Sequence, residues 1–152
     1  MSPQHHRAGP LPTLAALFVV SVVLNYFWEI AQGFLFVGME SWKNIWWHCF
    51  VASLGDGLIV WAIHAAGWRF FRRADWFMSA QLKVYGVMLM SGLIIAVAVE
   101  WLAVHLLQRW TYTAKMPVLP GVNIGIVPLL QMLILPPLIF YIAEKWLNRP
   151  RK

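Results

Sequence analysis

Three polar side chains interrupt the first long apolar run of the chain, and their spacing is that of a single helix face. Asn25, Glu29 and Gln32 are separated by four and then three residues. On an α-helix this spacing places all three on the same side. A carboxylate in an apolar helix is costly unless it faces protein groups or trapped water. Another segment of the chain is therefore expected to receive Glu29.

Each of the later apolar runs supplies a polar side chain that could meet Glu29. The second run contains Asp56, the third contains Glu100, and the fourth contains Gln131. Gly92 and Ala96 precede Glu100 at four-residue intervals. Small residues at this spacing form a groove in which a neighbouring helix can approach closely. We expect these polar groups to converge at similar depth.

Carboxyl groups that meet in a medium of low dielectric constant can do acid–base chemistry. Three of them cannot all stay ionised, so at least one is expected to keep its proton. A protonated acid beside an ionised one can transfer protons to and from an apolar substrate. The candidate catalytic residues are Glu29, as principal proton donor, with Asp56 and Glu100. The candidate substrate-binding residues are Asn25, Gln32, His48, Tyr112 and Gln131.

Composition indicates an integral membrane protein. Of the 152 residues, 61% are hydrophobic and 12% are charged, about half the charged fraction of an ordinary soluble domain. A bilayer accepts that much apolar surface, whereas a soluble domain of this length cannot bury it. The net charge of +6 lies in short basic groups between apolar runs, which argues against a nucleic-acid partner. The lone cysteine, Cys49, excludes an intrachain disulfide and a multi-cysteine zinc site.

The apolar runs predict an all-α fold, a transmembrane four-helix bundle that forms one integral membrane domain over residues 1–152. The expected helices cover residues of about 12–37, 45–66, 81–107 and 124–147. Each is long enough to cross a bilayer. A compact basic loop is expected at 67–75 and an irregular connector at 108–123, while His64 and Trp76 are expected in the membrane interface.

The distribution of Lys and Arg predicts the orientation. Four spans place both termini on one side of the membrane. That side holds nine basic residues: Arg7, Arg69, Arg72, Arg73, Lys83, Lys145, Arg149, Arg151 and Lys152. The other side holds Lys43, Arg109 and Lys115. The positive-inside rule then places both termini in the cytoplasm of a bacterial cell, with the acidic pocket in the outer half of its inner membrane and the connector as a cap.

Two alternatives remain open. The acids could be structural and hold the bundle in register, which would make the protein a non-catalytic membrane subunit or scaffold. A metal or haem carrier is the second alternative. Glu29, His48, Asp56 and Glu100 could hold a divalent ion, but no Glu-x-x-His or His-Glu-x-x-His spacing is present. Haem binding would depend on two histidines alone, His48 and His105. The leading interpretation therefore includes neither a metal nor a cofactor.

An ordered set of short motifs runs through most of the chain. These are Asn25-x-x-Trp28-Glu29-x-x-Gln32, His48-Cys49, Gly55-Asp56, Glu100-Trp101, Trp110-x-Tyr112, Met116-Pro117 and Pro128-Leu129-Leu130-Gln131. Together they resemble a family of small, uncharacterised bacterial multi-pass membrane proteins, which implies the fold but no activity. A fainter similarity, carried by Trp28-Glu29 and a later acid, is to integral-membrane terpene cyclases. Those cyclases are longer, so the similarity implies a homo-oligomer or a smaller lipophilic substrate.

Overall fold

Four long helices make up most of the described chain. The computed structural model describes residues 9–39, 41–79 and 81–149. The helices are α1 (Pro10–Gln32), α2 (Trp42–Phe71), α3 (Leu82–Trp101) and α4 (Ile126–Leu147). Short helical turns follow or join them at Gly33–Leu35, Trp76–Met78 and, as a π-helical continuation of α3, Leu102–Leu106. The predicted all-α fold is confirmed. Arg7, Arg151 and Lys152 of the orientation argument lie outside the described residues.

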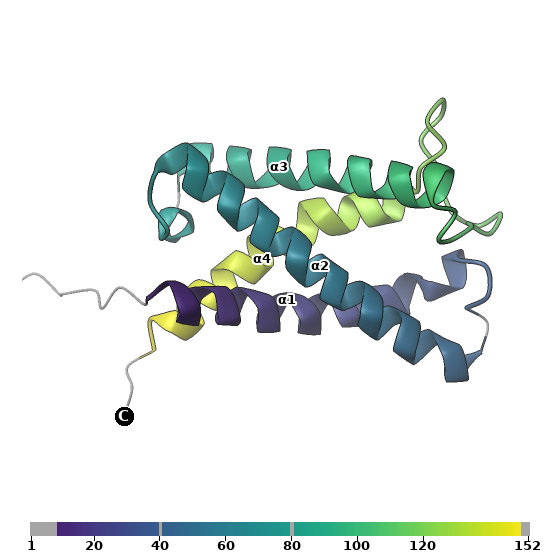
Figure 1. Cartoon of the computed structure of the whole chain (residues 1–152), viewed down its shortest axis with the longest axis horizontal. Helices are drawn as coiled ribbons and strands as arrows, with labels where there is room; N and C mark the ends of the chain where they lie inside the picture. The colour runs from purple at the N-terminus through teal and green to yellow at the C-terminus, as the bar shows by residue number, and fades with distance from the viewer. Residues whose placement is uncertain (1–8, 40, 80, 150–152) are drawn as a thin grey trace, which may run out of the picture.

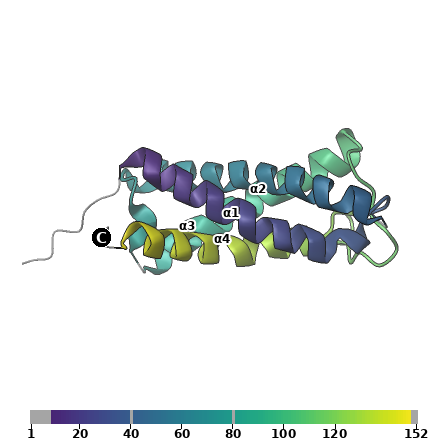
Figure 2. The same cartoon turned by 90° about the horizontal axis from the view of Figure 1, so that it is seen from below.

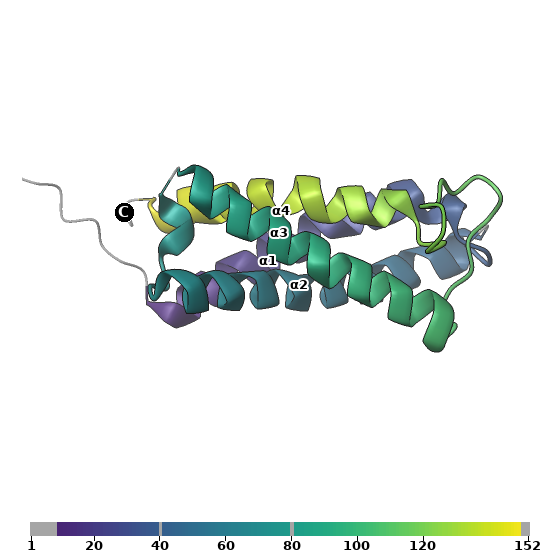
Figure 3. The ribbon, with the colours of Figure 1, turned by 90° about the horizontal axis from the view of Figure 1, so that it is seen from above.

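The helices run lengthwise in alternating directions, so that the start of α1 and the end of α4 lie at the same end of the bundle (Figure 1). Each helix packs on its neighbours in sequence, and α4 closes the ring against α1. Figures 2 and 3 show the bundle from opposite sides, with α1 in front in the first and α3 in front in the second. This up-down-up-down order brings residues from all four helices to the same depth, as a shared site requires.

All four helices are long and apolar enough to cross a membrane. The candidate spans are Pro10–Leu35, Lys43–Phe71, Leu82–Leu106 and Ile126–Leu147. The shortest has 22 residues, against the roughly 20 that a hydrocarbon core requires. Large apolar side chains, such as Phe27 and Leu82, are exposed on the outer faces of the bundle. The protein is therefore a multi-pass membrane protein.

The apolar core is concentrated at the end of the bundle where α1 begins and α4 ends. Trp76 and Phe77 of the α2–α3 turn are buried against Phe140 of α4. The Trp76 indole N–H donates a 3.1 Å hydrogen bond to the backbone oxygen of His64, whose Nε2 lies 2.9 Å from Ala74 O. The turn folds back between the helix ends and buries both side chains within the protein, while their depth relative to the membrane interface stays a prediction.

The second helix is longer than the sequence predicts. It begins at Trp42, capped by the Ser41 side chain, and continues to Phe71 before Arg72 adopts a left-handed conformation with φ 57°. The basic loop expected at 67–75 is therefore largely helical up to residue 71. Gly67 does not end the helix but makes room for Trp76. A Cβ atom at Gly67 would lie 2.1 Å from the Trp76 ring.

Candidate functional site

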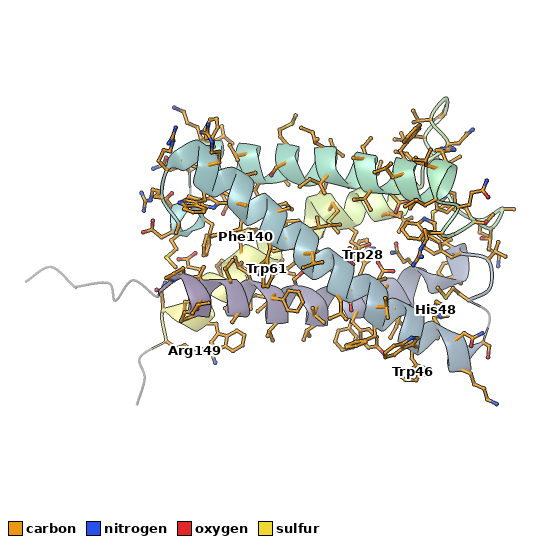
Figure 4. All side chains as sticks on the ribbon, viewed as in Figure 1. Trp28, Trp46, His48, Trp61, Phe140 and Arg149 are labelled. Atoms are coloured by element: carbon orange, nitrogen blue, oxygen red, sulfur yellow. The ribbon has the colours of Figure 1, made fainter. Side chains whose placement is uncertain are left out.

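Helix α1 contributes the polar face that the spacing predicts. Asn25 is fully buried, and its Nδ2 donates 2.9 Å hydrogen bonds to both the backbone oxygen and the Oγ of Ser21. Two turns on, Gln32 Nε2 donates to Glu29 Oε1 at 2.9 Å. The Trp28 indole N–H donates to Gln32 Oε1 at 3.2 Å, and Figure 4 shows Trp28 toward the middle of the bundle. Each of these bonds spans three or four residues, so the helix itself orients the side chains.

Gln131 of α4 joins this face to α2. Its side chain is 2% exposed, and its Oε1 accepts a 3.1 Å hydrogen bond from Gln32. Its Nε2 lies 2.8 Å from Asn25 Oδ1, 3.1 Å from Glu29 Oε1 and 3.1 Å from Asp56 Oδ2. An amide nitrogen carries only two hydrogens, so three acceptors share two donors. The Gln131 amide therefore holds the carboxyl groups of Glu29 and Asp56 at one point.

The shared nitrogen brings two acids into close range. Glu29 Oε1 and Asp56 Oδ2 lie at most about 6 Å apart, since each is 3.1 Å from the same atom. No cationic side chain pairs with either acid among the described residues, where the one ion pair joins Arg73 to Asp75. Two negative charges at this separation in a low-dielectric site repel strongly. The arrangement therefore favours a single negative charge shared by the two groups.

Glu100 of α3 is held by the connector between α3 and α4. It is 7% exposed, and its Oε2 accepts a hydrogen bond from the Tyr112 hydroxyl. The Tyr112 oxygen in turn accepts a 2.9 Å hydrogen bond from the backbone N–H of Gly125. Burial and, secondarily, the neighbouring Glu100 raise the pKa of Tyr112, which therefore remains a neutral hydrogen-bond donor. Tyr112 orients Glu100 without competing for its charge.

The connector is anchored to the segment that follows α1. Thr113 N donates to Leu35 O at 2.8 Å, and Val37 N donates to Thr111 O at 2.9 Å. These two bonds pair Phe36 with Tyr112 in a short antiparallel bridge, and the rings of the two residues lie 5.7 Å apart. The predicted cap over the pocket is thus a folded segment tied to the end of the first span.

The three acids line one cavity of about 540 Å³, a volume typical of small-molecule sites. All four helices and the connector contribute to it. The polar and charged lining residues are Glu29, Gln32, His48, Asp56, Glu100, Arg109 and Gln131. The other lining residues are mainly apolar or aromatic: Phe36, Met39, Trp47, Cys49, Val51, Ala52, Gly55, Ile59, Ala96, Val99, Trp110, Pro128 and Met132. An apolar chamber with a few convergent acids is suited to a lipophilic molecule with one polar end.

The structure brings most of the predicted site residues to this cavity. Asn25 and Tyr112 lie in a second layer, behind Gln131 and Glu100 respectively. His48 lies at the rim near the end of the bundle opposite Arg149, is exposed, and has its Nδ1 2.7 Å from Asn44 O (Figure 4). It does not contact the acids through any hydrogen bond recorded for the described chain.

The geometry gives no support to a metal centre in the described part of the chain. Within residues 9–39, 41–79 and 81–149, no three His, Cys, Asp or Glu side chains are grouped so that they could hold a metal ion. His105, the second haem candidate, is exposed, and its Nε2 lies 2.8 Å from the backbone oxygen of Val122.

Several lining residues were not predicted as part of the site. Trp47, Gly55 and Trp110 carry no charge, and an uncharged residue in an apolar run or in an irregular connector gives no signal of its own. The Trp110 indole nitrogen is buried beside Glu100 and Tyr112. The only sequence signal for these three residues was their position beside or within the motifs around Cys49, Asp56 and Tyr112.

Comparison with protein-family models, with curated proteins and with solved structures finds no match to this chain. The fold and the site define the class, a four-helix membrane protein with an acidic cavity. The resemblance to small bacterial membrane proteins stays a prediction.

Proposed function

We propose that this protein binds a lipophilic small molecule in the cavity of its bundle and transfers protons to or from it. One observation carries the proposal: Glu29, Asp56 and Glu100, from three different helices, line a single cavity whose remaining walls are mainly apolar. Ionisable groups within membrane spans are costly and are retained mainly where they function. Nothing in a purely lipid-facing bundle requires three of them at one level.

Glu29 and Asp56 form the acid–base pair of this proposal. Each carboxyl group accepts a hydrogen bond from Gln131 through one of its two oxygens. The second oxygen of each is not among the buried atoms that lack a hydrogen-bond partner, so it can face the cavity. The protonated member donates to the substrate and the ionised member accepts a proton from it. In this proposal Glu29 is the principal donor. Gln32 and Gln131 both hold its Oε1, so Glu29 is the more firmly positioned of the two acids and its Oε2 is left for the substrate. Glu100, fixed by Tyr112, faces the pair across the cavity.

The proposed location is the bacterial inner membrane, with both termini in the cytoplasm. The end of the bundle where α1 begins and α4 ends carries most of the basic residues within the described ranges, while Lys43, Arg109 and Lys115 lie at the other end. By the positive-inside rule the cavity then lies in the outer half of the membrane. Its substrate would be a lipid or another lipophilic molecule present in the outer leaflet.

A structural role for the acids is the alternative function. Its support is Gln131, because one buried side chain bonded to Asn25, Gln32, Glu29 and Asp56 also ties α1, α2 and α4 together. In that case the protein would be a membrane subunit or scaffold, and its partner would be another membrane protein or a second copy.

Comparison of membrane lipids tests the proposal. Cells that lack the protein would be complemented with the natural chain, with Glu29→Gln or with Glu144→Gln, an acid of α4 outside the cavity. At equal levels of folded protein, mass spectrometry of lipid extracts should show a lipophilic molecule that accumulates with Glu29→Gln and not with Glu144→Gln. Identical lipid profiles for all three would exclude acid–base turnover and favour the structural alternative.

A further inference from the structure

The acidic cavity reaches the side of the bundle between α2 and α3. Val51 of α2 and Val99 of α3 line it, yet they are 47% and 36% exposed. Ala52 and Gly55, also on the cavity wall, are exposed too. All four positions lie within membrane spans and are not covered by other parts of the described chain. They mark the wall at which the cavity can open laterally to the hydrocarbon region, so that a membrane-dissolved molecule would reach it without crossing water.

Charge indicates the kind of head group that would occupy the inner part of the cavity. Three carboxyl groups, of Glu29, Asp56 and Glu100, line it. Among the described lining residues the only Lys or Arg is Arg109, in the exposed connector. Arg109 makes no ion pair with any of the three acids in the described structure. Even with one acid protonated, the inner wall remains negatively charged. A cationic head would neutralise it, whereas an anionic head would add to the repulsion.

The aromatic lining favours the same kind of head. Phe36, Trp47 and Trp110 border the cavity together with the acids. The faces of aromatic rings attract cations, and a ring wall beside carboxylates is the usual means of recognising an ammonium group. The remaining wall toward the opening is apolar, with Val51, Ile59 and others. This side of the cavity suits a hydrocarbon chain.

We propose that the cavity binds a single-chain amphiphile with an ammonium head, which reaches the acids from the bilayer through the gap between α2 and α3. The proposal rests on the proposed function in taking this cavity as the ligand site, and it adds the class of ligand and its route. The head lies among Glu29, Asp56 and Glu100, and the chain passes Gly55 and Val99 into the lipid.

Gly55 provides a way to block the route without disturbing the bundle. It is helical and exposed, and a Cβ atom added there would meet nothing within 4 Å. Gly55→Leu would therefore place a side chain in the opening. Gly86 of α3 is a matched control, since it is also helical and exposed with nothing within 4 Å, but it does not line the cavity. Val99→Phe, from the opposite wall, is a second variant that narrows the opening.

The test is binding of dodecylamine and of dodecanol to the full chain in phosphatidylcholine nanodiscs, followed by native mass spectrometry with empty nanodiscs as background. We expect one dodecylamine per chain, bound at least about tenfold more tightly than dodecanol. Gly55→Leu and Val99→Phe should each weaken amine binding by about tenfold or more, and Gly86→Leu should not.

Three results would overturn the inference. Equal binding of amine and alcohol would exclude the ammonium head. Equal binding by Gly55→Leu and Gly86→Leu, with Val99→Phe also unaffected, would exclude the lateral route. Absence of binding by the natural chain would exclude the ligand class altogether. None of these outcomes decides the proposed function, which the lipid comparison with Glu29→Gln tests separately.

Discussion

Gln131 of α4 donates a 3.1 Å hydrogen bond to Asp56, which is the only acidic residue of the described helix α2. This bond joins the fourth membrane span to the second. The same nitrogen also contacts Asn25 and Glu29 of α1. A single amide thus determines how far apart two carboxyl groups lie. The position of the acids depends on the packing of three helices rather than on any one of them.

Replacement of Gln131 should loosen the bundle. Gln131→Met keeps the length of the side chain but removes the donor shared by Asn25, Glu29 and Asp56. Buried acceptors left without a donor cost about 1–3 kcal/mol each, so we expect the free energy of unfolding to fall by about 3 kcal/mol. Thermal unfolding in mild detergent, followed by circular dichroism, measures it. Gln81→Met, at an exposed residue before α3 with no side-chain capping bond, is the control. Equal melting temperatures for the two variants would contradict a central role for Gln131.

Loss of the Tyr112 hydroxyl should free the connector from Glu100. Tyr112→Phe keeps the ring against Phe36 but removes the bonds to Glu100 and Gly125. We expect a loss of about 2 kcal/mol and faster hydrogen exchange across 108–125. Tyr141→Phe is the control, because Tyr141 is exposed on α4. Unchanged exchange in the connector would show that Tyr112 does not anchor it.

The pH dependence of stability should report the same contact. Burial and Glu100 raise the pKa of Tyr112 above the value of about 10 that it has in an unfolded chain. The folded state therefore holds this proton more tightly, so its contribution is complete below pH 10 and is lost as pH rises toward the folded pKa. Between pH 9 and 11, the melting temperature of the natural chain should fall more steeply than that of Tyr112→Phe. Parallel curves would exclude a raised pKa at Tyr112.

The packing of α3 on α4 depends on Gly92. A Cβ atom there would lie 3.0 Å from the backbone oxygen of Met132. That oxygen lacks its usual helical donor, because residue 136, four positions on, is a proline. Gly92→Ala should therefore push the helices apart and destabilise the protein by about 1–2 kcal/mol. Gly86→Ala, with open space around it, should be neutral or stabilising by up to about 1 kcal/mol. Thermal unfolding of the two variants side by side checks this, and the reverse order of melting temperatures would rule it out.

Sequence periodicity was sufficient to predict which polar residues share a helix face. Asn25, Glu29 and Gln32 lie on one face because 3.6 residues per turn does not depend on the partner helix. Gly92, Ala96 and Glu100 are likewise all buried on one face of α3. The four-helix architecture followed from the length of the apolar runs. These features are local, so a single sequence contains them.

Features that depend on the meeting of distant segments could not be predicted in the same way. Gln131 was expected at the depth of Asp56, but its bonds to three acceptors depend on how α4 packs against α1 and α2. The bridge between Phe36 and Tyr112 joins irregular segments that have no periodic pattern. Gly67 was interpreted as a helix end, because a glycine that ends a helix and one that admits an indole ring look alike in sequence. The indole that gives Gly67 its role comes from the turn that follows.

The effect of removing one charge from the acid pair separates the catalytic from the structural interpretation. Glu29→Gln and Asp56→Asn keep an oxygen that can accept from Gln131 but eliminate the negative charge. If the acids are retained for proton transfer, their charge is a burden on the fold, and each variant should be as stable as the natural chain or more stable by roughly 1 kcal/mol. If the acids hold the bundle together, the charge-assisted bonds from Gln131 and Gln32 contribute to stability, and each variant should melt lower. Glu144→Gln, outside the cavity, sets the baseline in the same thermal unfolding measurement. A melting temperature several degrees below that baseline for both variants would show that the carboxylates are structural, and the proton-transfer proposal would have to be abandoned.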